Sequence, residues 1–235
     1  MSSNSHYIRP AARHMFTIGR DLIQDPTAAL IELIKNSYDA DSPDVVITFS
    51  ANDFEDAYEI IIEDHGHGMS RETVLGTWMV PSTDNKLRQE KSKSKKRHLQ
   101  GHKGIGRYAA SILGDTLELE TIDETGERTV AFIDWSQFEK IEFLDQVPIS
   151  IKTDQTEKAS GTKLTIKGGK NGLEYWTISK PEKRQKSGAI KPSEKNNFID
   201  LQYQLQKLIS PLEGYRFNQE SLDLDNFQIK IKTVN

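Results

Sequence analysis

The sequence predicts an α+β fold, a two-layer sandwich in which helices pack on one face of a mixed β-sheet. A long helical pattern begins directly after Asp25. Several shorter runs either alternate apolar and polar residues or are continuously apolar, as strands do; they cover residues 45–49, 58–63, 116–121, 129–134, 149–153 and 163–167. Because helices and strands follow one another without a regular strand–helix–strand alternation, the pattern favours a sandwich of this kind.

The helix that follows Asp25 carries a stripe of polar side chains. Asp25 is suited to be its N-cap, and Pro26 stands at the first helical position, where proline is well tolerated. Glu32, Asn36 and Asp39 follow at positions i, i+4 and i+7, so they lie on one side of the helix. Alanines beside the stripe leave room for a ligand, but a solvated helix face has the same appearance. The stripe alone therefore leaves both interpretations open.

The remaining elements are predicted from shorter patterns. Apolar periodicity between Ile8 and Leu22 indicates a short helix, and Ser70 caps a helix that runs towards Trp78. Further helices are predicted at 108–113 and 198–209, a turn at 123–126 and a strand at 227–234. We divide the chain into an N-terminal segment (1–20), a main domain (21–215) and the start of a following element or domain (216–235).

The composition limits the class of protein. The chain has 235 residues, enough for one large domain, and its net charge of −4 gives no global signal for a nucleic-acid partner. It contains no cysteine, which excludes disulfides and cysteine-bound zinc. No apolar run approaches the roughly 18 residues of a membrane helix, and the first residues lack a signal-peptide core. We therefore expect a soluble, cytoplasmic protein that does not contact a membrane.

A polar segment from Pro81 to Gln100 separates the two halves of the chain, and it is dense in lysine and arginine between Lys86 and Arg97. Such a run can contact nucleic acid, but it is more often solvated and mobile. We favour the solvated, mobile interpretation for this segment.

If the polar stripe is counted as the first motif, three further motifs follow it in the sequence. The second motif, Glu63–Met69, reads E-D-H-G-H-G-M and follows an apolar strand; the third, Gly101–Arg107, reads G-H-K-G-I-G-R and precedes a helical pattern. The fourth, Ser160–Thr162, reads S-G-T and precedes an alternating strand. The glycine spacing of the third motif, G-x-x-G-x-G, is neither that of a Walker A loop nor that of a Rossmann fingerprint.

In this order, the helical stripe and the three motifs closely resemble the N-box, D-x-G-x-G, glycine-rich lid and G-T motifs of the GHKL ATPase superfamily. Gyrase B subunits, heat-shock chaperone ATPases, histidine kinases and MutL belong to it. The resemblance spans roughly residues 18–167. It implies a Bergerat fold that binds ATP and Mg²⁺ between its helices and a lid, at about residues 79–103.

An adenine base needs an acceptor for its exocyclic amine inside a mostly apolar slot. Asp64 at the end of a strand supplies a carboxylate, and Gly66 and Gly68 let a base approach the backbone. Met69 offers an apolar contact. The resemblance adds Thr162, which would join Asp64 at the base through a water molecule.

A triphosphate needs backbone N–H donors and the positive end of a helix. We assign this role to the glycine-rich motif, whose expected ligand-contacting residues are Gly101, His102, Lys103, Gly104, Ile105 and Gly106. The resemblance further implies that Asn36 anchors Mg²⁺ and that Glu32 acts as the general base on the attacking water. We expect Asp39 to support the site through hydrogen bonds.

His65 and His67 invite a second metal interpretation through their spacing. Zinc in proteins takes three or four protein ligands, and no other liganding residue is placed in the sequence to complete such a set. We therefore do not expect a metal ion at these histidines.

The resemblance implies an ATP-hydrolysing switch in which ATP closes the lid and promotes homodimerisation through the N-terminal segment, although that segment equally suits a helix packed on its own domain. A protein kinase of the same superfamily and a non-hydrolysing ATP sensor remain alternatives. Glu32 favours hydrolysis, because typical histidine kinases carry asparagine there. Hydrolysing members usually receive a lysine or arginine from a following domain, so we expect a fragment or a short member. The sequence does not identify a client protein or DNA.

Overall fold

The computed structural model describes residues 8–20, 23, 25–52, 57–80, 91–94, 97–100, 106–169, 175–176, 197, 200–206 and 227–234. Its strands are β1 (Asp44–Asn52), β2 (Ala57–Asp64), β3 (Thr116–Ile122), β4 (Glu127–Asp134), β5 (Ser150–Gln155), β6 (Gly161–Gly169) and β7 (Gln228–Val234). Its helices are α1 (His14–Arg20), α2 (Pro26–Asp39), α3 (Arg71–Thr73), the π-helical η1 (Val74–Trp78), the 3₁₀ turns η2 (Gly106–Ala109) and η3 (Leu144–Gln146), α5 (Ala110–Leu113) and α6 (Gln137–Lys140).

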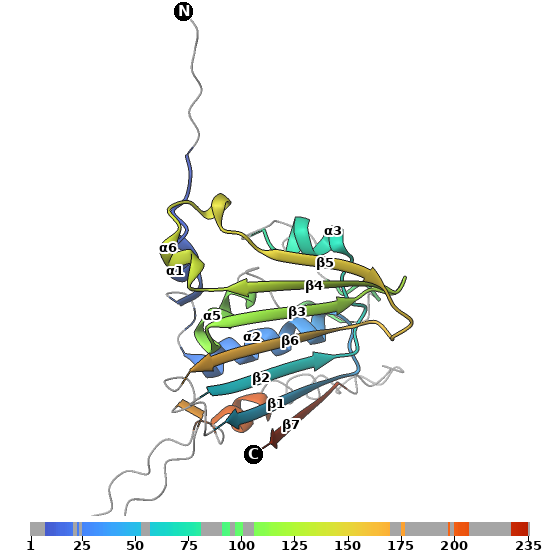
Figure 1. Cartoon of the computed structure of the whole chain (residues 1–235). Helices are drawn as coiled ribbons and strands as arrows, with labels where there is room; N and C mark the ends of the chain where they lie inside the picture. The colour runs from blue at the N-terminus through green and yellow to red at the C-terminus, as the bar shows by residue number, and fades with distance from the viewer. Residues whose placement is uncertain are drawn as a thin grey trace, which may run out of the picture.

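The strands form one seven-stranded mixed sheet in the order β5-β4-β3-β6-β2-β1-β7, with the helices on one face (Figure 1). Neighbouring strands are antiparallel except for β1 and β7, which are parallel. The predicted α+β sandwich with a mixed sheet is therefore confirmed.

The core lies between the sheet and α2. Ile60 and Ile62 lie on the face of β2 that α2 covers. They are buried, as are Leu30 and Ile34 of α2. The alternate positions face away from the helices and are largely charged, with Glu59 of β2 paired to a lysine of β6 at 3.5 Å. One face of the sheet is thus apolar and covered, while the other carries charged and polar side chains.

Helix α2 begins where its sequence predicts. The Asp25 side chain accepts a hydrogen bond from the Ala28 N–H at 2.8 Å, and Pro26 is the first helical residue. After the helix, Asp41 adopts a left-handed conformation with φ of 59°, which turns the chain into β1. This local geometry fixes the polar stripe of α2 above the ends of β1 and β2.

The C-terminal part of the chain returns to the sheet. Residues 200–206 are helical, as predicted, and Leu201 and Leu205 are buried in the core. Within the segment 216–235, which the sequence assigns to a following element or domain, Gln228–Val234 forms β7 at the edge of the same sheet. No helix in the described part of the chain is long and apolar enough to cross a membrane.

Candidate functional site

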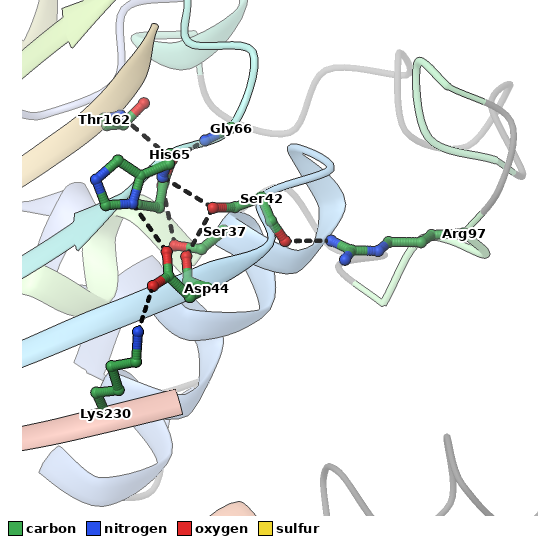
Figure 2. A network of polar contacts seen from close by, with 9 residues as sticks. Ser37, Ser42, Asp44, His65, Gly66, Arg97, Thr162 and Lys230 are labelled. Atoms are coloured by element: carbon green, nitrogen blue, oxygen red, sulfur yellow. Dashed lines mark hydrogen bonds and ion pairs between the residues drawn. The ribbon is translucent and has the colours of Figure 1, made fainter. Parts of the chain in front are cut away.

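The buried carboxylate of Asp64 is the centre of a polar cluster where β2 ends beside α2. Its Oδ2 accepts a hydrogen bond from the Ser37 hydroxyl of α2 at 3.0 Å. Its Oδ1 accepts two more, from the backbone N–H groups of Gly66 at 3.0 Å and Thr162 at 3.2 Å. Figure 2 shows Ser37 of α2, Gly66 of the loop after β2 and Thr162 of β6 lying close to one another. The cluster therefore joins helix α2, the second motif and the last motif.

The hydrogen-bonding capacity of Asp64 is not exhausted by these contacts. A carboxylate offers about four lone-pair sites, and the protein fills three of them, so about one remains, on Oδ2. The residue is only 8% exposed, and burial raises its pKa despite the hydrogen bonds from Gly66, Ser37 and Thr162 and the nearby His67, all of which oppose the rise. An additional donor at this position would compensate the buried charge.

The glycines of the second motif are required by contacts within the protein. A Cβ on Gly66 would lie 2.6 Å from the carbonyl oxygen of Ala40, at the end of α2. Gly68 has φ of +62°, and a Cβ there would collide with the Ile122 carbonyl oxygen of β3. The structure adds a packing requirement to the expectation that these glycines let a base approach the backbone, and that expectation stays a prediction. They let the loop pack between α2 and β3.

A hydroxyl pair lies beside Asp64 on the adjacent strands. The Oγ1 atoms of Thr162 on β6 and Thr121 on β3 are 3.1 Å apart. Thr121 also accepts a hydrogen bond from the Met69 N–H at 2.9 Å, which ties the end of the second motif to the sheet. Because Thr121 is fully buried, this pair holds the Thr162 hydroxyl in a defined position next to the carboxylate.

The polar stripe of α2 divides into two differently constrained parts. Glu32 is paired with Lys35 at 2.7 Å, and both side chains are partly exposed, Glu32 to 33% and Lys35 to 23%. Asp39 is buried and accepts a hydrogen bond from the Gln100 N–H at 2.7 Å. Asn36 lies between them, partly buried, on the same helical face.

The segment that precedes the glycine-rich motif is attached to the end of α2 by Arg97. Its Nη1 donates to the backbone oxygen of Tyr38 at 3.0 Å and to that of Ser42 at 2.7 Å, the second of which Figure 2 shows. Its guanidinium lies over the rings of Tyr38 and Phe227, 4.5 and 5.4 Å from their centroids. Arg97 thus departs from the solvated basic run that we expected; Lys91 and Lys93 are exposed, and the run's other lysines lie outside the described residues.

A second attachment of this segment involves Asp41. Its carboxylate accepts hydrogen bonds from the Ser94 N–H at 2.8 Å and the Ser94 hydroxyl at 2.7 Å. Burial by itself raises the pKa of Asp41, but hydrogen bonds from Ser92 and Ser94 and the charge of Arg97 outweigh that effect and lower the pKa. Residues 91–94 and 97–100 are therefore held against α2 by several polar contacts.

The two histidines of the second motif bind to neighbouring protein groups. His65 Nδ1 is 2.8 Å from Asp44 Oδ1, and Lys230 of β7 reaches the other oxygen of Asp44 at 2.8 Å (Figure 2). Hydrogen bonds from Lys230 and His65 lower the pKa of Asp44. His67 Nδ1 lies 2.8 Å from the Gly68 carbonyl oxygen. Among the described residues, no group of three or more His, Asp or Glu is arranged to hold a metal ion.

Most of the glycine-rich motif lies outside the described residues, namely Gly101, His102, Lys103, Gly104 and Ile105. Gly106 begins η2, and α5 continues it to Leu113, so the helical pattern predicted after the motif is confirmed. The start of this helical region contacts α2. The motif therefore enters the fold beside the helix that carries the polar stripe.

Several residues of the cluster carry no motif in the sequence. The side chains of Ser37, Thr121 and Arg97 form these hydrogen bonds with residues between 27 and 59 positions away in the chain. A hydroxyl at position 121 does interrupt a strand face otherwise occupied by Leu117 and Leu119, and this is the signal that could have identified it. Nothing comparable marks Ser37 or Arg97.

A comparison with protein-family models supports the grouping of these motifs. The model described as Histidine kinase-, DNA gyrase B-, and HSP90-like ATPase matches residues 24–162, more than half of the chain. The matched range begins just before α2 and ends at Thr162, so it contains every part of the Asp64 cluster. A search of curated proteins found no match.

Proposed function

The chain belongs to the histidine kinase-, DNA gyrase B- and HSP90-like ATPase family, and from this premise we propose that it binds ATP with Mg²⁺ and hydrolyses it. Domains of this family bind ATP. The adenine would lie against Asp64, and the phosphates would lie towards the Glu32 part of α2 and the glycine-rich motif. The arrangement of the Asp64 cluster supports the first of these assignments most directly.

The observation that carries the proposal is the remaining acceptor position on Asp64. An adenine amine donates hydrogen bonds, and a buried carboxylate with one unfilled lone-pair site and a raised pKa is matched to such a donor. Thr162, held by Thr121, supplies a neighbouring hydroxyl that can donate or accept. A hydrogen bond to a charged group is worth about 1.5–3 kcal/mol, enough to select adenine over a base that lacks this donor.

At the phosphate end, Glu32 would accept the proton of the water that attacks the γ-phosphorus, as ADP leaves with the electrons of the broken P–O bond. Lys35 already contacts Glu32 at 2.7 Å and would orient its carboxylate. Asn36, one helical turn later, fits a Mg²⁺ anchor because this ion binds few protein ligands and prefers oxygen. When bound, Mg²⁺ neutralises the charge that develops on the phosphates during transfer.

We further propose that residues 79–103 act as the lid and that ATP promotes homodimerisation through the N-terminal segment 1–20. The contacts of Asp39, Asp41 and Arg97 support a lid that is attached to α2 at its C-terminal part. Hydrogen exchange in the apo state and with a non-hydrolysable ATP analogue tests this. Equal protection of residues 79–103 in the two states would contradict lid closure.

The experiment that tests the function uses the full chain with MgATP. Calorimetry measures nucleotide binding, and release of inorganic phosphate measures hydrolysis. A γ-labelled nucleotide that transfers its label to protein would instead indicate a kinase, and binding without turnover would indicate a sensor. Absence of any adenine nucleotide binding by the folded chain would contradict the proposal as a whole.

A further inference from the structure

Thr121 carries a hydroxyl that belongs to the polar cluster around Asp64 but cannot touch a ligand itself. It is fully buried on β3, which lies between β4 and β6 in the sheet (Figure 1). Thr162 lies directly opposite it on β6, is only partly buried and donates its N–H to Asp64. Any effect of Thr121 on a nucleotide must therefore pass through a neighbouring group, and Thr162 is the neighbour that adjoins the proposed base site.

The three neighbours of the Thr121 Oγ1 atom limit where its single proton can go. The Met69 N–H donates to this atom at 2.9 Å and so occupies one of its lone pairs. The Gly161 carbonyl oxygen at 3.3 Å and the Thr162 hydroxyl at 3.1 Å are the two groups that can accept the proton. The distance between the two hydroxyls is the shorter one and the nearer to the usual range for O–H···O bonds.

The choice between these two acceptors sets whether Thr162 donates to a ligand or accepts from it. If Thr121 donates to Gly161, the Thr162 hydroxyl donates its own proton to Thr121 and can only accept from a ligand. If Thr121 donates to Thr162, the Thr162 proton is free to be donated outwards. A hydroxyl has one proton, so Thr162 cannot donate in both directions.

An adenine base requires the second arrangement. Its exocyclic amine, which the proposed site places on Asp64, is flanked by the ring nitrogens N1 and N7, and both of them are acceptors. Thr162 is the residue opposite Asp64 in the β2–β6 pairing, so whichever nitrogen turns towards β6 meets a hydroxyl that must donate. The same holds if a water molecule lies between them and gives its two protons to the nitrogen and to Asp64.

We propose that Thr121 is a positioning residue for the nucleotide base: it donates its proton to Thr162 and thereby makes the Thr162 hydroxyl a donor towards a ring nitrogen of adenine. This role of Thr121 rests on the proposed adenine site at Asp64. Asp64 accepts from the amine, and Thr162 donates to the adjacent nitrogen. Together they recognise a donor beside an acceptor, which is the pattern of adenine and not of guanine.

Three nucleotides test the direction of this hydrogen bond in the full chain. ADP avoids turnover, and 1-deaza-ADP and 7-deaza-ADP each replace one of the two ring nitrogens by C–H. In calorimetry with Mg²⁺, the wild type should bind one of the two analogues about 2–10-fold more weakly than ADP, the effect of one neutral hydrogen bond. Thr121→Val keeps the side-chain shape and removes the hydroxyl that orients Thr162, so it should reduce this affinity ratio towards one. If Thr121 instead donates to Gly161, the same variant would release the Thr162 proton and raise the ratio.

Thr129→Val is the matched control for this substitution. Thr129 lies opposite Thr121 on β4 and is equally buried, and its hydroxyl has no hydrogen-bond partner within the described part of the chain, so the ratio should stay unchanged. Thr121→Ser keeps the hydroxyl and should retain the ratio. Thr121→Ala takes the place of Thr121→Val if that variant does not fold. In Thr162→Val the ratio should fall to one, and adding Thr121→Val should change it no further.

The affinity ratio separates this role from a purely structural one. A structural role of Thr121 would weaken the binding of ADP and both analogues alike and leave the ratio at its wild-type value, which would overturn the proposal. A higher ratio in Thr121→Val, or a wild type that binds ADP and both analogues equally, would overturn it as well, while the proposed ATP site would stand. Absence of ADP binding by the folded wild type would contradict the proposed function itself and this role of Thr121 with it.

Discussion

The two parts of the polar stripe on α2 are constrained to very different degrees. At the C-terminal part, Asp39 and the neighbouring Ser37 are buried, and their hydrogen bonds reach the segment before the glycine-rich motif and β2, respectively. In the middle of the helix, the Glu32 carboxylate pairs with Lys35 of the same helix, and both side chains are partly exposed. The end of the helix near Asp64, which we propose binds the base, is therefore preorganised by the fold, whereas the Glu32 side chain is held only within its own helix.

This difference suggests that the two ends of the helix serve different proposed roles, one in nucleotide binding and the other in hydrolysis. A preorganised group binds without the cost of ordering it, so the Asp64 end is suited to affinity. A group that must move a proton benefits from adjusting to the substrate, and its contacts tighten only when the substrate is bound. Substitutions at the two ends should consequently separate binding from turnover.

The largest effect is expected for Glu32→Ala. Hydrolysis should fall by about 10²–10⁴-fold, because the general base is lost. Nucleotide affinity should be nearly unchanged, because the proposed adenine site around Asp64 stays intact. Asn36→Ala should instead lose the Mg²⁺-dependent part of the affinity. Single-turnover phosphate release and calorimetry of both variants make the comparison. General damage to the helix would affect the two alike, and wild-type turnover by Glu32→Ala would exclude the catalytic assignment.

The next largest effect is expected for Asp64→Asn, which should weaken nucleotide binding by about 10–100-fold through loss of a charged acceptor. The fold should survive, because the amide oxygen can still accept from the Gly66 and Thr162 N–H groups and its NH₂ can donate to Ser37. Calorimetry and thermal unfolding of the same sample separate these two quantities. Unchanged affinity in a folded variant would contradict the adenine assignment.

The same carboxylate predicts a pH dependence. Burial raises the pKa of Asp64, so the protonated form, which cannot accept the adenine amine at that oxygen, appears at a higher pH than for an exposed aspartate. Adenosine affinity of the wild type should therefore fall as the pH is lowered towards that raised pKa. The effect of pH on folding stability has the opposite sign. The raised pKa of Asp64 stabilises the folded state below the unfolded-state pKa of about 3.9, and this stabilisation is lost as the pH rises through the raised pKa. Asp64→Asn should abolish both dependences.

A smaller effect, on stability, is expected for Arg97→Ala. The variant removes two hydrogen bonds to backbone oxygens and the contacts with two aromatic rings, and should lower the free energy of unfolding by about 1–3 kcal/mol. Amide exchange at Leu99 and Gln100 should accelerate. Arg97→Lys is the control, since it keeps the charge but not the planar fork. Unchanged exchange in Arg97→Ala would show that this attachment does not hold the segment.

The smallest effect is expected for Lys35→Met, which breaks a partly exposed ion pair within one helix. Such pairs contribute about 0.3–0.5 kcal/mol, so the free energy of unfolding should change by no more than that. Denaturant unfolding measures it directly. A loss as large as that expected for Arg97→Ala would contradict the contrast drawn between the two ends of the stripe.

The sequence by itself determined the features that depend on neighbouring residues. Asp25 and Pro26 specify where α2 begins, and a spacing of three to four residues places Glu32, Asn36 and Asp39 on one face. Short runs of apolar or alternating residues predicted six of the seven strands near their observed positions, and the pattern at residues 227–234 predicted the seventh. The order of the four motifs identified the family, because each motif is short and contiguous.

Only the tertiary structure decided which distant groups meet. Ser37 donates to Asp64 across 27 positions, and Arg97 reaches the end of α2 across 55 or more. The parallel pairing of β7 with β1 joins residues more than 180 positions apart, and no local pattern encodes the partner or direction of a strand. Likewise, Gly66 and Gly68 are needed because Ala40 and Ile122 pack against them. The physical reason is common to all of these: local preferences act over a few residues, whereas strand pairing and buried hydrogen bonds are selected by how the whole chain packs.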